Sequence, residues 1–130
     1  MKTVYDFLKE AKTYYIATID GETPRVRPFG TIDLFEGKLY FQTGRVKPCY
    51  KQMKENPKIE ICAMKGMEWI RISATAVEDT NIEAEKHLLE AYPELQGRYQ
   101  PGDGNNVVFY LKDATAVISS FTTEPVTIQF

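Results

Sequence analysis

The strongest constraint on the fold is a long alternating run, residues 68–78, which predicts a β-strand. Because successive side chains of a strand point to opposite faces, this run has one apolar face and one mixed face. The apolar face carries Ile70, Ile72, Ala74 and Ala76, and the other face carries Trp69, Arg71, Ser73 and Thr75. A turn at Lys65-Gly66 separates the run from another predicted strand, residues 58–64.

Turn signals divide the rest of the chain into similar short pieces. Asp20-Gly21 and Glu36-Gly37 separate three extended runs, whose short connections are typical of an antiparallel meander. Helical spacing and capping predict helices at residues 2–12, 48–55 and 81–91, the last capped by Thr80 or Asn81. The remaining strands are expected at residues 14–19, 24–35, 38–43, 107–119 (with room for a bend at Lys112-Asp113) and 126–130.

Six or seven antiparallel strands with three helices predict a mainly β, α+β chain. Such a set favours a closed or nearly closed barrel with helices over its ends, because closure removes exposed sheet edges. At 130 residues, without an internal repeat or a linker, the chain is expected to form one domain, residues 1–130.

Composition limits the function classes. The net charge of −2 argues against bulk attraction to nucleic acid. No apolar run approaches the length of about 18 residues that a membrane span needs, and the N-terminus lacks the apolar core of a signal peptide, so we expect a cytoplasmic protein. Cys49 and Cys62 are expected to be free thiols. With a single histidine, His87, in a helix and expected at the surface, no metal site is predicted.

A basic stretch around residue 48 is the first candidate site. Pro48 suits the first turn of a helix, and Arg45, Lys47 and Lys51 lie at or just before that start. Cations at a helix N-terminus oppose its dipole, so their presence there favours a bound anion such as a phosphate. The alternative is a solvated basic loop. Cys49 follows Pro48, and its thiol is interpreted as a bystander.

Two strand faces supply the other candidates. In the run 24–35, alternation places Arg25, Arg27, Phe29 and Thr31 opposite Val26, Pro28, Ile32 and Leu34. Trp69 and Arg71 share a face of the long strand. Each pair has a structural alternative, namely a solvated strand face for the arginines and a Trp half-buried under an Arg stem. Taken together, cations and aromatic rings fit a planar anionic ligand, such as a phosphorylated cofactor with an aromatic ring.

The order of these pieces resembles the pyridoxamine 5′-phosphate oxidase-like FMN-binding split barrels, and within them the small nitroimidazole-resistance (Nim-type) group. The likeness covers almost the whole chain. The residues that carry it are Ile16-Ala17-Thr18 with Asp20-Gly21, Pro24 to Gly30, Gly37 to Thr43, Lys47-Pro48, Tyr50 to Met53, Asn56 to Ile61, Trp69 to Ile72, Phe109-Tyr110-Leu111 and Ser120-Phe121-Thr122.

This resemblance implies a split β-barrel homodimer with FMN sites at the subunit interface. It implies a flavin ring along the strand that contains Arg25, Val26, Arg27, Pro28 and Phe29. The phosphate would be held by that strand's arginine and by Lys47 and Lys51, with Gln52 nearby. Gln42 and Thr43 match positions that touch the cofactor, and Trp69 and Arg71 would reach the site from the partner subunit.

The resemblance therefore predicts an FMN-dependent oxidoreductase that acts on an unknown small molecule. Pyridoxal phosphate formation is not expected, because the full-length oxidases have a C-terminal Trp and a substrate-phosphate Arg that this sequence does not show. Nim-type proteins have a histidine near the start of the barrel, whereas His87 lies in a helix. The alternatives are a non-catalytic flavin carrier or sensor, and a barrel of this type that binds haem or a deazaflavin.

Overall fold

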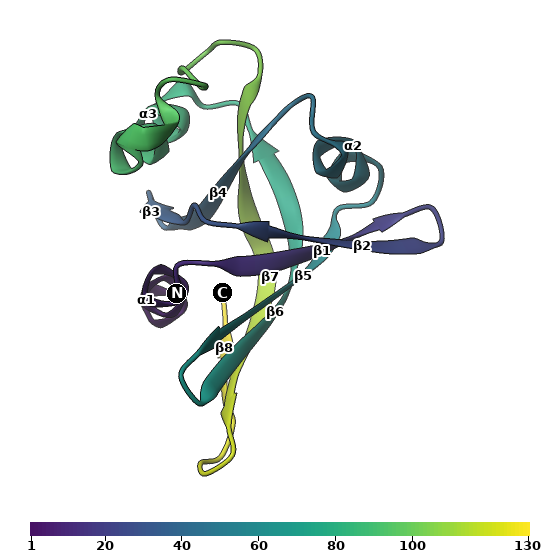
Figure 1. Cartoon of the computed structure of the whole chain (residues 1–130), viewed down its shortest axis with the longest axis vertical. Helices are drawn as coiled ribbons and strands as arrows, with labels where there is room; N and C mark the ends of the chain where they lie inside the picture. The colour runs from purple at the N-terminus through teal and green to yellow at the C-terminus, as the bar shows by residue number, and fades with distance from the viewer.

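Eight strands form one antiparallel sheet, whose order is β2-β1-β5-β6-β7-β4-β3, with β8 paired to β7. The computed structural model describes residues 1–130 (Figure 1). The strands are β1 (Tyr14–Asp20), β2 (Thr23–Phe29), β3 (Asp33–Phe35), β4 (Lys38–Gly44), β5 (Lys58–Lys65), β6 (Glu68–Asp79), β7 (Asn106–Ser120) and β8 (Val126–Gln129). The predicted class, mainly β with flanking helices in a barrel-like arrangement, is confirmed.

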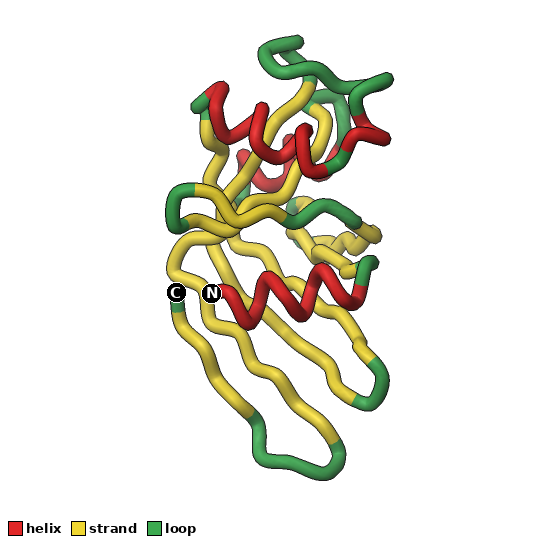
Figure 2. The backbone as a smooth tube through the Cα atoms, turned by 90° about the vertical axis from the view of Figure 1, so that its left-hand side faces the viewer, coloured by secondary structure: helices red, strands yellow, loops and turns green.

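Three α-helices and one 3₁₀ turn accompany the sheet. They are α1 (Lys2–Ala11), α2 (Pro48–Glu55), α3 (Ile82–Ala91) and η1 (Pro93–Leu95), so the three predicted helices are confirmed. The side chain of Asn81 accepts a hydrogen bond from the Glu83 amide and caps α3. In Figure 2, α1 crosses the sheet close to the two chain termini, which lie near each other. None of these helices is long and apolar enough to cross a membrane.

The core lies on the inner face of the curved sheet. The alternation expected for β6 holds, since Ile70 and Ile72 are fully buried while Arg71 and Ser73 are exposed. Met53 of α2 and Phe7 of α1 join the same cluster, so both helices cover the inner face. Fully burying a side chain of this size contributes about 1.5–3 kcal/mol, and this apolar contact therefore fixes where α2 sits against the sheet.

The prediction of one strand over residues 24–35 is wrong. This segment contains two strands, so the sheet has eight strands where six or seven were predicted. The chain leaves β2 after Phe29 and begins β3 at Asp33, because Thr31 and Ile32 are both buried and break the alternation. The Thr31 hydroxyl accepts a hydrogen bond from the Gln42 amide, 3.0 Å, and the Thr31 carbonyl accepts one from Tyr14. Tertiary hydrogen bonds thus hold the segment between the strands.

The predicted three-strand meander is also wrong. β2 pairs only with β1, and β3 pairs with β4, which continues to β7. The pairing path therefore starts at β2 and ends at β3, and no ladder joins these two strands. The predicted bend in β7 is confirmed, because Asp113 has a φ of 51° and the β6–β7 register shifts beside it. Beyond this bend β7 pairs with β8 instead of β4.

Candidate functional site

A groove runs between the edge strand β2 and the start of α2. It consists of two adjoining cavities of ≈ 380 and ≈ 680 Å³, which share Arg27, Pro28, Lys47 and Cys49 as wall residues. Pockets of about 300–1,000 Å³ are typical of small-molecule and cofactor sites. Of the residues predicted to bind a cofactor, the groove brings together Arg25, Val26, Arg27, Pro28, Phe29, Gln42, Thr43, Lys47 and Gln52.

Arg27 is held by acceptors on two neighbouring elements. Its Nη1 donates to the Ile16 carbonyl at 3.1 Å and to the Thr18 hydroxyl at 2.7 Å, both on β1. Its Nη2 donates to Oε1 of Gln52 on α2 at 2.7 Å. Thr18 in turn donates to the same Gln52 oxygen at 2.6 Å. The guanidinium is therefore fixed in one orientation along the groove, and it carries its full positive charge there.

The three cations near the start of α2 have different surroundings. Lys47 lines both cavities and has no ion-pair partner in the chain. Arg45 points away from the groove, since its guanidinium bonds the Glu78 carboxylate at 3.3 Å and the Gly104 carbonyl at 2.9 Å. Lys51 is exposed on the helix, 4.0 Å from Glu55. Of these three cations, only Lys47 brings an unpaired charge to the groove.

Glu78 is the centre of the cluster that binds Arg45. Partial burial acts to raise its pKa, but hydrogen bonds from Tyr50 and Lys54 and the nearby cations outweigh this, so the Glu78 pKa is lowered. Lys54 lies 3.0 Å from the carboxylate, and the Tyr50 hydroxyl donates to it at 2.8 Å. Burial, followed by this hydrogen bond, raises the pKa of Tyr50. The cluster anchors the loop that precedes α2.

Arg25 occupies the open end of the groove. It lies on the same face of β2 as Arg27, as alternation predicts, and its Nε is 3.3 Å from the Asp20 carboxylate. Both side chains are about half exposed, so the pair is worth little in stability. Arg25 is therefore available to a ligand. Val26 and Pro28 have their side chains on the other face of β2, so they contribute mainly strand backbone to the groove wall.

The opposite end of the groove is more enclosed. Gln42 is buried and donates to the Asn106 side chain at 3.0 Å. The Thr43 hydroxyl lies 3.4 Å from the thiol of Cys49, which is buried and free. Phe29 packs edge-on against Phe41, with ring centroids 5.5 Å apart. These contacts make a rigid polar and aromatic floor.

Sequence reasoning missed the wall that follows α3. This wall consists of Tyr92, Glu94, Leu95, Arg98 and Tyr99. Tyr92 fixes it to the sheet, because its hydroxyl accepts from the Ile32 amide at 2.9 Å and donates to the Ile32 carbonyl at 3.0 Å. The two segments are about 60 residues apart in sequence, and no local pattern connects them. Pro93, which marks a turn after the helix, was the only available signal.

Trp69 and Arg71 are not in the groove of their own chain. They project from the outer face of the sheet, where Met64 pairs with Trp69 and Cys62 pairs with Arg71. Trp69 packs on Phe121, with ring centroids 5.1 Å apart. A single chain therefore keeps these two predicted cofactor contacts on the face opposite to Arg27.

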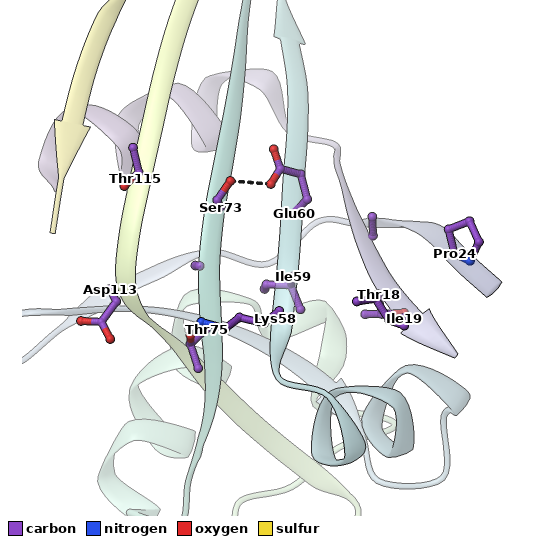
Figure 3. A pocket seen from close by; sticks show the side chains of 12 residues that line it. Thr18, Ile19, Pro24, Lys58, Ile59, Glu60, Ser73, Thr75, Asp113 and Thr115 are labelled. Carbon is purple, nitrogen blue, oxygen red and sulfur yellow. Dashed lines mark hydrogen bonds between the residues drawn. The ribbon is translucent and has the colours of Figure 1, made fainter. Parts of the chain in front are cut away.

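The outer face is hollowed and partly apolar. A cavity of ≈ 420 Å³ lies over β1, β5, β6 and β7, where the hydroxyl of Ser73 donates to Glu60 at 2.6 Å (Figure 3). Large apolar side chains are exposed along this face, including Tyr15, Ile19, Val26 and Met64. Exposed apolar residues gathered on one sheet face are typical of an interaction surface.

His87 lies outside the groove. It is a partly exposed residue of α3, and its Nδ1 is 2.6 Å from the buried Asp33 carboxylate. Its ring packs on Phe35 with centroids 4.6 Å apart. The contact joins α3 to β3, so the histidine has a structural role here.

Comparison with known proteins agrees with this geometry. The family model described as pyridoxamine 5′-phosphate oxidase matches residues 1–117. A NimC/NimA family protein from Clostridium acetobutylicum superposes with a TM-score of 0.97 at 40% identity, over 100% of this chain and 92% of that one. No curated protein matches the sequence.

More distant structures share the fold. General Stress Protein 26 from Bacillus anthracis has a TM-score of 0.75 at 15% identity, over 99% of this chain and 98% of that one. A pyridoxamine 5′-phosphate oxidase-related, FMN-binding protein from Nostoc punctiforme has a TM-score of 0.59 at 14% identity, covering 97% and 90%.

The chain therefore belongs to the pyridoxamine 5′-phosphate oxidase family. Its 40% identity to the NimC/NimA family protein confirms the predicted likeness to the Nim-type group.

Proposed function

We propose that this protein binds FMN in the groove and acts, as a cytoplasmic homodimer, as a flavin-dependent oxidoreductase on a small molecule. The observation that carries the proposal is the meeting of Lys47, which has no partner, with Arg27, which is held in place by Thr18 and Gln52. Family membership supports the same ligand.

The residues of the groove fit the parts of FMN. Phosphate is best held by several charged donors, and the end of the groove that contains Arg25, Arg27 and Lys47 supplies them. The enclosed end offers an apolar and aromatic surface at Phe29 with polar groups at Gln42 and Thr43, which suits a planar ring with hydrogen-bonding edges.

A second copy of the chain would complete the site. The outer face exposes Tyr15, Ile19, Val26 and Met64, and the same face carries Trp69 and Arg71. Covering this face with an identical chain removes the apolar surface from water. It would also let Trp69 and Arg71 of one subunit approach the groove of the other, which a single chain does not allow.

FMN, when bound, supplies hydride or electron transfer, and the protein supplies binding, orientation and electrostatics. Arg27 and Lys47 would hold the phosphate, and Gln42 and Thr43 would orient the ring edge. No pair of acidic side chains is aimed into the groove, since Asp20 is paired with Arg25 and only Glu94 lines the enclosed end. We therefore expect no obligatory protein acid or base.

The first experiment compares Lys47→Ala with the matched variant Lys51→Ala. Loss of a charged hydrogen-bond donor at the phosphate should weaken FMN binding by about 10- to 100-fold, and riboflavin binding should change much less. Lys51 lies outside the groove, so its variant should stay near wild type for both ligands. Fluorescence titration measures the four affinities.

Equal losses for FMN and riboflavin in Lys47→Ala would contradict the phosphate assignment. A colourless wild-type protein that does not bind added FMN would reject the flavin function itself. Anaerobic mixing of the yellow protein with NADH or NADPH separates an enzyme from a carrier, because rapid bleaching indicates a reductase.

A further inference from the structure

Thr18 is a buried polar residue on an otherwise apolar strand face. On the inner face of β1 it follows Tyr14 and Ile16, and it is only 2% exposed. A buried hydroxyl is costly unless it is hydrogen-bonded. Here the hydroxyl both accepts and donates, since its oxygen accepts a hydrogen bond from Arg27 at 2.7 Å and its O–H donates one to Gln52 at 2.6 Å. The hydroxyl thus links the strand arginine to α2.

The same contacts fix the orientation of the Gln52 amide. Arg27 can only donate, so the atom of Gln52 that faces it must be the oxygen. Thr18 donates to that oxygen as well, and the amide nitrogen Nε2 therefore points the other way. The protein supplies no acceptor for Nε2, and no fully buried side-chain nitrogen or oxygen lacks a partner. Nε2 is consequently not fully buried, and Gln52 is part of the groove wall.

We infer that Thr18 is a positioning residue for the phosphate end of the groove. It holds Arg27 in place and turns Gln52 so that an amide donor joins Lys47 there. The ligand class is a phosphate monoester, and the inference rests on the proposed FMN function. Pre-oriented donors bind an anion more tightly because less side-chain freedom is lost on binding.

The test replaces Thr18 by Val, which keeps the β-branched shape that strands favour but has no hydroxyl. Thr18→Ser is the matched control, because it keeps the hydroxyl and loses only a methyl group. In Thr18→Val we expect FMN affinity to fall about three- to tenfold, the effect of losing one well-oriented hydrogen bond to the phosphate. Riboflavin affinity should not change, and Thr18→Ser should bind FMN like the wild type.

A double-mutant cycle with Gln52→Met shows whether Thr18 acts through Gln52. The effects on FMN affinity should be less than additive, because the two side chains share one hydrogen bond. Thermal unfolding of each variant without ligand separates a change in stability from a change in phosphate preference.

Wild-type protein that binds FMN while Thr18→Val binds it equally well would overturn this inference alone. Equal losses of FMN and riboflavin affinity in Thr18→Val, or full additivity in the cycle, would also overturn it. Wild-type protein that binds no FMN would overturn the proposed function and this inference together, so the two failures are distinguishable.

Discussion

The two faces of the β1–β2 hairpin have opposite characters. On the inner face, Thr18 and Arg27 are joined by hydrogen bonds that leave no buried side-chain polar atom without a partner. On the outer face, Tyr15 and Val26 are 48% and 67% exposed. The polar groups of the inner face find their partners within a single chain, whereas the outer face leaves apolar side chains exposed to water.

This difference separates the properties of the site that one chain provides from those that the proposed dimer would add. Donors that are oriented by the fold itself, such as Arg27, are present before any ligand or partner arrives. Trp69 and Arg71, on the outer face, have no route to the groove of their own chain. Substitutions that affect one chain or the proposed dimer test this division.

The largest effect is expected from a charge on the outer face. Tyr15→Glu should convert the proposed dimer to monomers, since a two-fold interface contains each substituted residue twice and buries an unpaired charge. We expect dimer affinity to fall by about 100-fold or more. Analytical ultracentrifugation measures this.

Val46→Glu is the matched control, because Val46 is 81% exposed in the loop before α2. It should leave the oligomeric state unchanged. A wild-type protein that is already monomeric would show that the outer face has another role.

A smaller effect is expected from Arg71→Ala. If the partner's arginine reaches the groove, this change should weaken FMN binding about three- to tenfold in the dimer, the range for one hydrogen bond. The same change should have no effect in the monomeric Tyr15→Glu background. Titration of FMN into both pairs of proteins measures the difference.

Lys86→Ala provides the control, since this exposed lysine of α3 pairs only with Glu83 on its own helix. An Arg71→Ala effect of the same size in dimer and monomer would contradict a contribution across the interface.

The smallest effect concerns the cluster that keeps Arg45 out of the groove. The pKa of Glu78 is lowered in the folded protein, so its ionised form stabilises the fold above the ordinary glutamate pKa. That contribution is lost as the pH falls through the lowered value. Glu78→Gln should therefore lower the free energy of unfolding by about 1 kcal/mol at pH 7, and by less at acid pH.

Urea unfolding at neutral pH and at about pH 3, below the ordinary glutamate pKa, measures this dependence. Glu90→Gln is the control, because Glu90 is exposed on α3 and forms no ion pair. A difference between wild type and Glu78→Gln that does not change with pH would mean that the charge of Glu78 does not contribute.

Much of the secondary structure was predictable because local chemistry determines it. The alternation of β6 and the cap of α3 at Asn81 follow from strand geometry and from hydrogen bonding at a helix end. The segment around Thr31 and Ile32 was not predictable. In the sequence, its alternation of side chains continued that of β2. In the structure, hydrogen bonds with Gln42 and Tyr14 from other strands decided its path, and both residues are buried.

The candidate site divides in the same way. Arg25 and Arg27 were expected on one face because they are two positions apart on a strand, and the β1–β2 register agrees. The sequence did not show that Lys47 lines the groove while Arg45 does not. That difference depends on the bond between Arg45 and Glu78, which lies 33 residues away along the chain.

The sequence by itself determined the helices and most strands, because short-range periodicity, turns and caps act between near neighbours, and the order of its motifs carried the resemblance to the family. Only the tertiary structure decided that the Gln52 oxygen accepts from Arg27 and that Tyr92 brings a further wall to the groove. Alternation put Trp69 and Arg71 on the face away from Ile70 and Ile72, but only the tertiary structure placed that face opposite to Arg27. These side-chain orientations and positions depend on contacts between residues that are distant in sequence. Hydrogen bonding and burial determine those contacts once the sheet has formed.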